Sequence, residues 1–404
     1  MTMENADKAP AARGIPPAAH SGAIPWVRLR SAASGPQLYK RMIAEADPKA
    51  KAGDIVAVYD KTGAPYGAAL YNPKSLIGLR LLQRGLEGFD AEAFFTEKIA
   101  RAVELRRGLL RLDDTTQAYR LVHDNGDGLP GLVVDRYADR VVLEFYSLGM
   151  FHQAARIERG FKAHFPEAKF VHRASQHAQT MEGFRLKPAA PSRVRVRENG
   201  VLFEIELSAG RKTGFFCDQR ENRLAFASFA AGRKTVDVCA YTGGFGLYAA
   251  KAGASEVTCV ELDPEACEAA RRNSNINQAR LEIVCVDAFP YLRQAAANKR
   301  RWGLAVVDPY KLIASREGYQ EGRKKYVDLN RLAFSVLDPG GVLLTCSCSG
   351  MLSWEEFQQC VRTAAGSAGR RVQIFRKSGA AADHPFAADH PEGEYLKVLW
   401  CRVL

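Results

Sequence analysis

Two cysteines near the C-terminal end of the chain have the residue type and the setting that nucleophilic catalysis requires. Cys346 and Cys348 lie in residues 345–350, Thr-Cys-Ser-Cys-Ser-Gly, directly after an apolar run that predicts a β-strand. Cysteine attacks carbon as the thiolate, which a neighbouring positive charge or helix N-terminus favours. Such a nucleophile can form a covalent bond to an otherwise unreactive ring carbon and so activate the ring for a further reaction.

A glycine-rich segment, residues 236–263, predicts the site of an adenosine-containing cofactor. A Val-rich run breaks into Gly243, Gly244 and Gly246, a helix-forming segment follows, and a second apolar run ends at Glu261, which is the pattern of a βαβ unit. The glycines let the backbone turn tightly and let a ligand approach the helix N-terminus. Glu261 follows Gly243 by 18 residues (261 − 243), close to the roughly 20-residue spacing at which an acid meets a ribose.

The same glycines leave two other interpretations open. Residues 244–249, Gly-Phe-Gly-Leu-Tyr-Ala, also satisfy the dinucleotide pattern G-x-G-x-x-A, and a glycine cluster alone is compatible with an ordinary strand-to-helix turn. Further strands are expected at 281–286, 304–307 and 342–347, and they end beside Asp287, Asp308 and the two cysteines. Since open α/β sheets bind ligands at the carboxyl ends of their strands, one crevice is expected to collect these groups.

The final strands favour a methyltransferase over a dehydrogenase. Residues 371–375 and 395–403 are strand-like, and the loop between them is too irregular for a helix, so they are expected to pair antiparallel. The predicted fold class is α/β: a Rossmann-like class I methyltransferase sheet with an antiparallel terminal hairpin, preceded by a central α/β domain and a small β-rich domain. A helix is also expected at 326–337, followed by a turn at 338–341.

Upstream patterns divide the rest of the chain. Residues 1–25 lack periodicity and are expected to be a disordered tail, whereas residues 26–90 alternate short strands with turns, as in a small β-barrel. Residues 91–190 are expected to form a central α+β domain, with a hairpin over 132–146 and an amphipathic helix over 150–165. The last boundary is placed near residue 190, in a proline-containing stretch, so the catalytic domain covers 191–404.

The composition and net charge of the chain favour a cytoplasmic protein with a polyanionic partner. The formal net charge of +12 and the sequence pI near 9.3 favour nucleic acid. All nine cysteines lie in the C-terminal half without a C-x-x-C pair or zinc spacing, which predicts a reduced chain without a structural metal. No stretch approaches the roughly 20 apolar residues of a membrane helix, and the N-terminus lacks the apolar core of a secretory signal, so no membrane partner is expected.

Several motifs together resemble one family of RNA-modifying enzymes. They lie at 212–223, 241–246, 345–350, 382–385 and 391–393, and the similarity extends upstream through 126–137 to cover nearly everything after about residue 36. These segments resemble the S-adenosylmethionine-dependent methyltransferases that make 5-methylcytosine in bacterial large-subunit ribosomal RNA. The resemblance implies an N-terminal PUA domain, a central domain and a Rossmann-like catalytic domain, with S-adenosyl-L-methionine as cofactor. It implies large-subunit (23S) ribosomal RNA as the partner, free or in an early assembly intermediate, and leaves a homodimer open.

The resemblance also implies roles for individual residues. Cys348 matches the catalytic position and is expected to be the nucleophile, which makes Cys346 a core neighbour. Asp308 is expected to hold the pyrimidine edge through a hydrogen bond, and Lys311 to polarise it. No metal site is expected, since His384 and His390 fit capping turns. Glu261 is expected on the ribose and Asp287 on the adenine edge, in a cofactor site made of Gln219, Tyr241, Thr242, Gly243, Phe245, Glu261, Asp287 and Asp308.

One position departs from the family pattern. The family's motif reads Asp-Pro-Pro-Lys, whereas residues 308–311 read Asp-Pro-Tyr-Lys. Because proline fixes φ and tyrosine does not, this loop is expected to be looser or differently shaped, with Tyr310 either stacked on the base or obstructing the pocket. The change motivates two rivals to cytosine-5 methylation: methylation of an exocyclic amine without a covalent adduct, and an RNA-binding protein that holds S-adenosylmethionine without turnover. The basic stretch 316–325 is expected to contact the RNA backbone.

Overall fold

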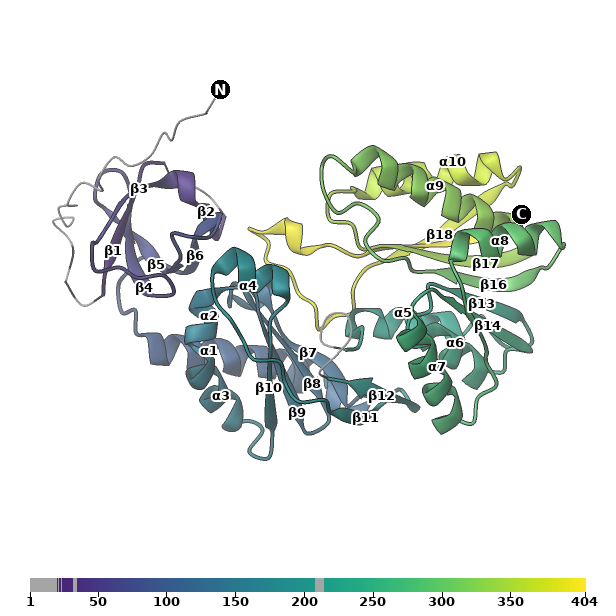
Figure 1. Ribbon diagram of the computed structural model, residues 1–404, viewed down its shortest axis with the longest axis horizontal. Helices are drawn as coiled ribbons and strands as arrows, with labels where there is room; N and C mark the ends of the chain where they lie inside the picture. Colours follow the sequence, from purple (N-terminus) through teal and green to yellow (C-terminus); the bar gives the residue numbers. More distant parts are fainter. Residues whose placement is uncertain (1–19, 21, 23, 32–34, 208–213) are drawn as a thin grey trace, which may run out of the picture. The chain divides into compact units, whose positions relative to one another are not determined.

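The computed structural model describes residues 20, 22, 24–31, 35–207 and 214–404, which separate into two compact units. The first unit takes in the chain up to Leu109 together with Arg120–Ala190 and Pro385–Pro391; the second takes in Leu110–Tyr119, Pro191–His384 and Glu392–Leu404. Residues 1–19 of the expected tail fall outside the described residues, as do Lys212 and Thr213 of the family motif. Figure 1 labels the elements of each unit.

A six-stranded sheet forms the N-terminal part of the first unit. Its strands follow the order β2-β6-β5-β4-β1-β3 and enclose an apolar cluster that includes Val27, Leu38, Val56 and Leu79. Aliphatic and aromatic residues make up most of these strands, and the buried ones supply this cluster. The strands are β1 (Trp26–Leu29), β2 (Gln37–Tyr39), β3 (Ile43–Ala46), β4 (Ile55–Tyr59), β5 (Pro65–Tyr71) and β6 (Ile77–Arg84).

A four-stranded sheet of order β10-β9-β8-β7 completes the first unit. The expected hairpin is confirmed, with Leu132 opposite Phe145 and Tyr137 opposite Arg140. The single helix expected over 150–165 is wrong, because Gln153 (φ −89°, ψ 3°) leaves the helical conformation and separates two helices. The elements are α1 (Ala91–Val103), β7 (Ala118–His123), β8 (Leu132–Tyr137), β9 (Arg140–Phe145), α2 (Leu148–His152), α3 (Ala154–Lys162), β10 (Lys169–Arg173) and α4 (Gln176–Glu182).

A seven-stranded sheet of order β15-β14-β13-β16-β17-β19-β18 organises the second unit. The first five of these strands run parallel, and β19 pairs antiparallel with both β17 and β18, so the predicted α/β class and its antiparallel terminal hairpin are confirmed. The strand order reverses at β13 and β16, and such a switch point opens a crevice at the carboxyl ends of the strands. The strands are β13 (Lys234–Val238), β14 (Glu256–Glu261), β15 (Glu282–Cys285), β16 (Trp302–Val307), β17 (Leu337–Ser347), β18 (Val372–Ser378) and β19 (Lys397–Val403).

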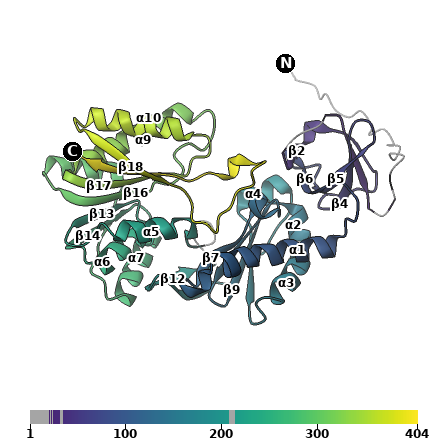
Figure 2. The ribbon, with the colours of Figure 1, turned by 180° about the vertical axis from the view of Figure 1, so that it is seen from behind.

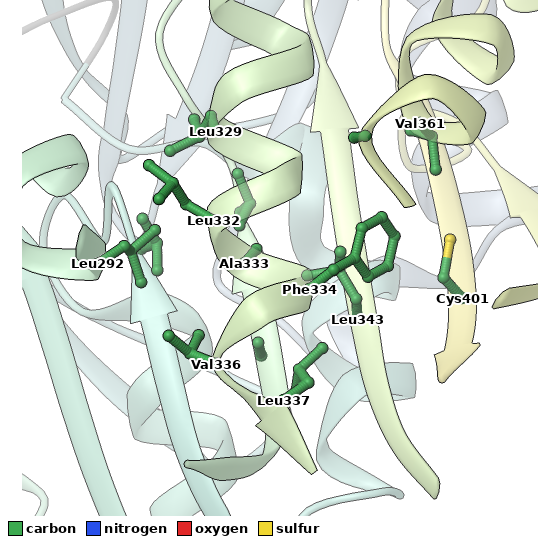
Figure 3. Close-up of a cluster of buried hydrophobic side chains, with 14 of the residues drawn as sticks. Leu292, Leu329, Leu332, Ala333, Phe334, Val336, Leu337, Leu343, Val361 and Cys401 are labelled. Carbon is green, nitrogen blue, oxygen red and sulfur yellow. The ribbon is translucent and has the colours of Figure 1, made fainter. Parts of the chain in front are cut away.

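Helices cover both faces of this sheet, as Figures 1 and 2 show. On one face lie α5 (Arg220–Ala227), α6 (Gly244–Lys251) and α7 (Pro264–Ile276), and the hairpin of β11 (Arg193–Glu198) and β12 (Val201–Glu206) packs on α7. On the other lie α8 (Ala288–Ala297), α9 (Tyr319–Ser335) and α10 (Trp354–Ser367). Figure 3 shows the core under this second layer, where Leu292, Leu332 and Val361 of the helices belong to the same buried cluster as Leu343 and Cys401 of the sheet.

Two predicted boundaries around α9 are wrong. The helix begins at Tyr319 rather than 326 and ends at Ser335 rather than 337. Its first turns are largely polar and half-exposed, so they carry little of the apolar period from which a helix is predicted. The turn expected at 338–341 is a bulge within β17, since Leu337 pairs with Trp302 and Val342 already with Leu304.

Within the described ranges, none of the helices combines the length and apolarity needed to traverse a bilayer.

Candidate active site

A pocket of about 660 Å³ lies at the carboxyl ends of the parallel strands in the second unit. Nearly all of the residues predicted for the site line it, so the sheet brings together groups that are up to 129 positions apart (348 − 219). Gly243 is the exception: it stands at the N-terminus of α6 with φ +80° and does not line the pocket, whereas its neighbour Gly244 does. The predicted residues that line the pocket are Gln219, Tyr241, Thr242, Phe245, Glu261, Asp287, Asp308, Lys311 and Cys348.

The loop between β13 and α6 is held in an uncommon backbone conformation. Cys239 (φ +61°) and Tyr241 (φ +50°) are non-glycine residues in the left-handed region, where an L-residue is strained. Gly246 is needed for a different reason, since a Cβ there would lie 2.4 Å from the Cys259 Sγ of β14. The absence of that Cβ lets the first turn of α6 pack closely on the sheet, which points the helix N-terminus at the pocket.

Glu261, at the end of β14, is fixed by backbone N–H groups. Its Oε2 accepts a hydrogen bond from the Tyr241 amide (2.7 Å), and its Oε1 accepts from the amides of Leu262 (2.8 Å) and Asp263 (2.9 Å). A carboxylate has about four acceptor positions, so one remains for a ligand hydroxyl. Asp287 is placed in a similar way, because its Oδ1 caps α8 by accepting from the Phe289 amide at 2.7 Å.

Asp237 also lines the pocket, and the sequence analysis did not single it out. Its side chain is buried: Oδ2 accepts from the Gly246 amide (2.8 Å), and Oδ1 has no hydrogen-bond partner among the residues described. Burial raises the pKa of Asp237 to about 7, and the charges of Asp308 and Glu261 add to the increase. The available signal was an acid inside an apolar strand, Val-Asp-Val.

These acids make the pocket suitable for a cationic cofactor. Six acidic residues line it, and one of them, Asp237, keeps a buried oxygen without a donor among the described residues. S-adenosylmethionine carries a sulfonium and an ammonium group, which would supply positive charge, and ribose hydroxyls, which would donate to Glu261. The side chains present therefore fit this cofactor.

Asp308, at the end of β16, is positioned by side chains that come from distant elements. Its Oδ2 accepts from Gln219 Nε2 (3.0 Å), whose Oε1 accepts in turn from Asn222 Nδ2 (2.7 Å). Asn222 Oδ1 then accepts from the Ser378 hydroxyl of β18 (2.7 Å). Gln219 was predicted as a cofactor contact and here also holds Asp308. Asn222 was missed, because a buried asparagine in a helix has no distinguishing sequence pattern.

The two cysteines of the 345–350 motif have different surroundings. Cys346 is fully buried, and burial raises the pKa of its thiol well above the usual range. Cys348 is only partly buried and lines the pocket, with its Sγ 3.9 Å from the carbonyl oxygen of Pro309. Cys348 therefore lies beside the loop that begins at Asp308.

The serines on either side of Cys348 tie two loops together through Tyr326 of α9. Ser347 donates to the Tyr326 hydroxyl (2.9 Å), and the Ser349 hydroxyl lies 3.0 Å from the same oxygen. Ser349 also accepts from the backbone N–H of Ile313 (3.2 Å), beyond Asp308 in sequence. Burial raises the pKa of Tyr326 to about 12, so its hydroxyl stays neutral at pH 7. The hydroxyl cluster fixes the cysteine loop against the aspartate loop.

The remaining predicted residues lie at the edge of the site or away from it. Tyr310 lines the pocket and is 60% exposed, and Lys311 is exposed beside it. His384 is buried with its Nδ1 3.0 Å from Asp383 Oδ1, and Asp383 also forms two hydrogen bonds with Arg220. Burial alone would raise the pKa of Asp383, but His384 and Arg220 hold it below its usual range. In the part of the chain that the structure describes, no three His, Cys, Asp or Glu side chains are grouped to hold a metal ion.

Profiles of two known families match separate parts of the chain. A profile of S-adenosylmethionine-dependent methyltransferases matches residues 182–365, and a PUA-like domain profile matches residues 31–84. A protein of Pseudoalteromonas atlantica named ribosomal RNA large subunit methyltransferase I is 36% identical over 377 residues, 91% of this chain and 95% of its own length. A protein of the same name from Vibrio cholerae is 33% identical over 380 residues, with the same coverage of both chains.

Solved structures agree on the fold. A protein from Streptococcus mutans, classed as a SAM-dependent methyltransferase, superposes with a TM-score of 0.77 at 20% identity, over 94% of this chain and 100% of that chain. The structure of SMU.776, also classed as a methyltransferase and complexed with SAH, matches with the same values. The chain therefore belongs to the ribosomal RNA large subunit methyltransferase I family, within the S-adenosylmethionine-dependent methyltransferases.

Proposed function

We propose that this protein transfers a methyl group from S-adenosylmethionine to carbon 5 of a cytosine in large-subunit ribosomal RNA, with Cys348 as the nucleophile. The observation that carries the proposal is the placement of Cys348 and Asp308 in the pocket that also contains Glu261, while Cys346 is sealed in the core. The names of the relatives supply the class of RNA. A thiol, a carboxylate and a cofactor pocket in one crevice suit covalent activation of a pyrimidine.

The residues of the pocket have separate roles in this reaction. The target cytosine leaves its stack and enters the pocket, where Asp308 accepts a hydrogen bond from the pyrimidine edge and Lys311 polarises the ring. The Cys348 thiolate forms a bond to carbon 6, which makes carbon 5 nucleophilic. Bound S-adenosylmethionine supplies an electrophilic methyl group on a positively charged sulfur. Carbon 5 gains the methyl group as the bond from that methyl to the sulfonium sulfur would break, with S-adenosylhomocysteine as the leaving group. Carbon 5 then loses its proton to water, after which the bond from the Cys348 sulfur to carbon 6 breaks and restores the thiolate.

RNA binding is proposed for the basic surface around the start of α9. The stretch 316–325 includes Arg316, Lys324 and Lys325, which are exposed, and the whole chain carries a net charge of +12. Phosphate contacts of this kind supply affinity without base specificity. We also propose the division into a PUA-like domain (26–90), a central domain (91–190) and a catalytic domain (191–404), and a cytoplasmic location.

Tyr310 supports a second candidate function. Its ring is 60% exposed at the pocket, where a flat aromatic surface can stack on a base. In this alternative the base stacks on Tyr310, an exocyclic amine accepts the methyl group, and Cys348 forms no bond to the substrate. The two candidates differ in the methylated atom and in their dependence on the thiol.

Mass spectrometry of nucleosides separates the candidates. Large-subunit ribosomal RNA from cells that lack the gene is incubated with methyl-labelled S-adenosylmethionine and either wild-type protein, Cys348→Ala or the matched control Cys346→Ala. We expect labelled 5-methylcytidine from the wild type, a loss of roughly a thousandfold or more with Cys348→Ala, and retention within about tenfold with Cys346→Ala. A labelled base methylated on an exocyclic amine, formed equally well by Cys348→Ala, would replace the first candidate with the second.

A further inference from the structure

The edge strand β18 exposes large apolar side chains to solvent. It is the last strand in the order of the seven-stranded sheet and pairs with β19 alone among the described strands. The five residues from Gln373 to Lys377 are all exposed, and they include Ile374 (41% exposed) and Phe375 (47% exposed). A strand that only packs on a core alternates buried and exposed residues, so a run exposed on both faces indicates a binding surface.

A β-bulge gives Phe375 its exposed position. Between Ile374 and Arg376 the register with β19 shifts by one residue, so Phe375 is the extra residue of the bulge. Bulges of this kind redirect a side chain out of the regular pattern of a sheet. The Phe375 ring rests on one side against Phe229, with the ring centroids 6.0 Å apart at an angle of 61°. The protein therefore supports this ring and leaves about half of it accessible.

The two cations that follow Phe375 in the chain are held by aromatic rings. The guanidinium group of Arg376 lies over the buried Trp400 indole, 5.1 Å from the ring centroid. The ammonium group of Lys377 lies 5.7 Å from the ring centroid of Trp354. A cation over a ring face is attracted by the electron density of the ring and keeps its charge. The rings therefore fix the positions of the two charges without neutralising them.

Carboxylates do not neutralise these charges either. In the part of the chain that the structure describes, no acidic oxygen lies within 4.0 Å of Arg376, of Lys377 or of Arg402, an exposed residue of the neighbouring β19. By contrast, the exposed Lys234 of β13 pairs with Glu256 at 3.1 Å. Free cations beside an accessible aromatic ring suit a single-stranded nucleic acid, because its phosphates attract the cations and its bases stack on the ring.

The register of the sheet connects this edge to the pocket. β17 and β18 both pair antiparallel with β19, so they run in the same direction, and β18 ends at the edge of the sheet where the pocket lies. Ser378 and Cys346 are both partners of Val398, which places the end of β18 two strands, about 10 Å, from the strand that leads to Cys348. An RNA strand with one base in the pocket can therefore continue along β18.

We propose that Phe375, Arg376, Lys377 and Arg402, here called the β18 strip, bind the single-stranded RNA next to the target nucleotide. Phe375 stacks on a base, and the three cations contact phosphates. A second copy of the chain suits the strip less well, because the bulge interrupts the strand edge and two-fold symmetry would bring like charges together. The inference rests on the proposed function, which makes ribosomal RNA the substrate.

The direct test measures RNA affinity as a function of salt concentration. Filter binding follows the full-length protein with large-subunit ribosomal RNA from cells that lack the gene. Arg376→Gln, Lys377→Gln and Arg402→Gln should each reduce the slope of log Kd against log salt concentration by about 0.7, because each loses one phosphate contact. Phe375→Leu keeps an apolar side chain without a ring, so its Kd should rise roughly tenfold at every salt concentration, and Phe375→Tyr should restore most of the affinity. The matched control Lys234→Gln lies at the start of β13, at the opposite end of the parallel strands, and should change neither quantity.

Cross-linking and kinetics give two further readouts. Ultraviolet cross-linking of the same RNA to the wild-type protein, followed by peptide mass spectrometry, should recover a nucleotide on a peptide that contains Phe375. In Phe375→Leu and Arg376→Gln the KM for RNA should rise, while kcat at saturating RNA and the Kd for S-adenosylmethionine stay within about twofold. An unchanged affinity for S-adenosylmethionine also shows that each variant is folded.

The outcomes separate the β18 strip from the proposed function. Wild-type RNA affinity and salt dependence in all the strip variants, with 5-methylcytidine still formed, would overturn the strip and keep the function. RNA binding that depends on the strip, with no 5-methylcytidine formed, would keep the strip and remove the function. If Phe375→Leu changed the oligomeric state in light scattering but not the RNA affinity, the strip would be an interface between two copies, and the proposal would be wrong.

Discussion

The cofactor side and the transfer side of the pocket are built from different kinds of contact. On the cofactor side, Asp237 and Glu261 are held by backbone N–H groups of the loops that follow β13 and β14. On the transfer side, Asp308 is held through Gln219, and the Cys348 loop is held through Tyr326, which are side chains of other elements. Backbone contacts depend on one local conformation, whereas side-chain contacts depend on how distant elements pack.

This difference predicts separate functional consequences. Changes on the cofactor side should alter the affinity for S-adenosylmethionine, because its carboxylates line the pocket in which the cofactor is proposed to bind. Changes in the supports of the transfer side should alter turnover at saturating cofactor, because they displace reacting groups without touching the cofactor. If variants on either side changed both the cofactor affinity and the turnover, the two sides would not be functionally separate.

Among these variants Asp237→Asn should have the largest effect, and the quantity it changes should be the free energy of unfolding. Burial raises the pKa of Asp237 from 3.8 in the unfolded chain to about 7 in the folded protein, so the folded state binds the proton more tightly. The contribution of Asp237 to the stability of the ligand-free protein should therefore be most favourable below about pH 4 and should fall as the pH rises toward 7. Removing the buried charge should raise the free energy of unfolding at pH 8 by up to about 4 kcal/mol, measured by urea denaturation.

The same variant should bind S-adenosylmethionine more weakly, because an anion that faces the cationic ligand has been removed. Asp338→Asn, at an exposed position of β17, is the matched control and should change neither quantity. A difference in unfolding free energy between Asp237→Asn and wild type that is constant from pH 4 to pH 8 would contradict the assignment of the shifted titration to Asp237.

Glu261→Ala tests the cofactor side through binding. Loss of the carboxylate removes the acceptor for the ligand and releases the Tyr241, Leu262 and Asp263 amides, so the Kd for S-adenosylmethionine should rise on the order of 100-fold. Isothermal titration calorimetry measures the change. Glu265→Ala, at an exposed position in the first turn of α7, should leave the Kd within about twofold. A rise of less than threefold for Glu261→Ala would show that this acid does not contact the cofactor.

Asn222→Ala tests the transfer side at a residue that does not line the pocket. Without Asn222 the Gln219 amide loses the partner that orients it toward Asp308, so kcat should fall about tenfold while the Kd for S-adenosylmethionine stays within about twofold. Ser378→Ala removes the hydrogen bond to Asn222 and also the acceptor of the Trp400 indole N–H, and it should lower kcat about threefold or less. If Asn222→Ala weakened cofactor binding by the same factor as it lowered kcat, the two sides of the pocket would not act separately.

Tyr326→Phe should have the smallest effect. It removes the hydroxyl that joins Ser347 and Ser349, which should lower the free energy of unfolding by about 1–2 kcal/mol and kcat by a few fold. Thermal unfolding and steady-state kinetics measure the two changes. Tyr319→Phe, whose hydroxyl bonds Glu356 on α10 instead, is the control and should leave kcat unchanged. A loss of stability without any change in kcat would make the hydroxyl cluster purely structural.

Local patterns sufficed for much of the fold. The alternation of strands and helices after residue 234 predicted the parallel sheet. The irregular loop before residue 395 predicted that the last two strands pair antiparallel. The errors fell where local signals are weak. The first turns of α9 are mostly polar, so they show little of the repeating apolar pattern from which a helix is predicted. The break at Gln153 lies between two amphipathic segments whose combined pattern predicted a single helix.

The sequence by itself predicted the glycine loop and closing acid of the cofactor side, because the strand, glycines and acid of residues 236–263 are neighbours in the chain and act through backbone geometry, although it gave no role to Asp237. Only the tertiary structure decided the transfer side. Cys346 and Cys348 are two residues apart, a spacing that puts side chains on one face of a regular strand. β17 ends at Ser347, so Cys346 stays in the core while Cys348 leaves the strand and reaches the pocket. The supports of the loop that carries that thiol come from α9 and from the loop that follows β16, whose proximity depends on the packing of the sheet as a whole.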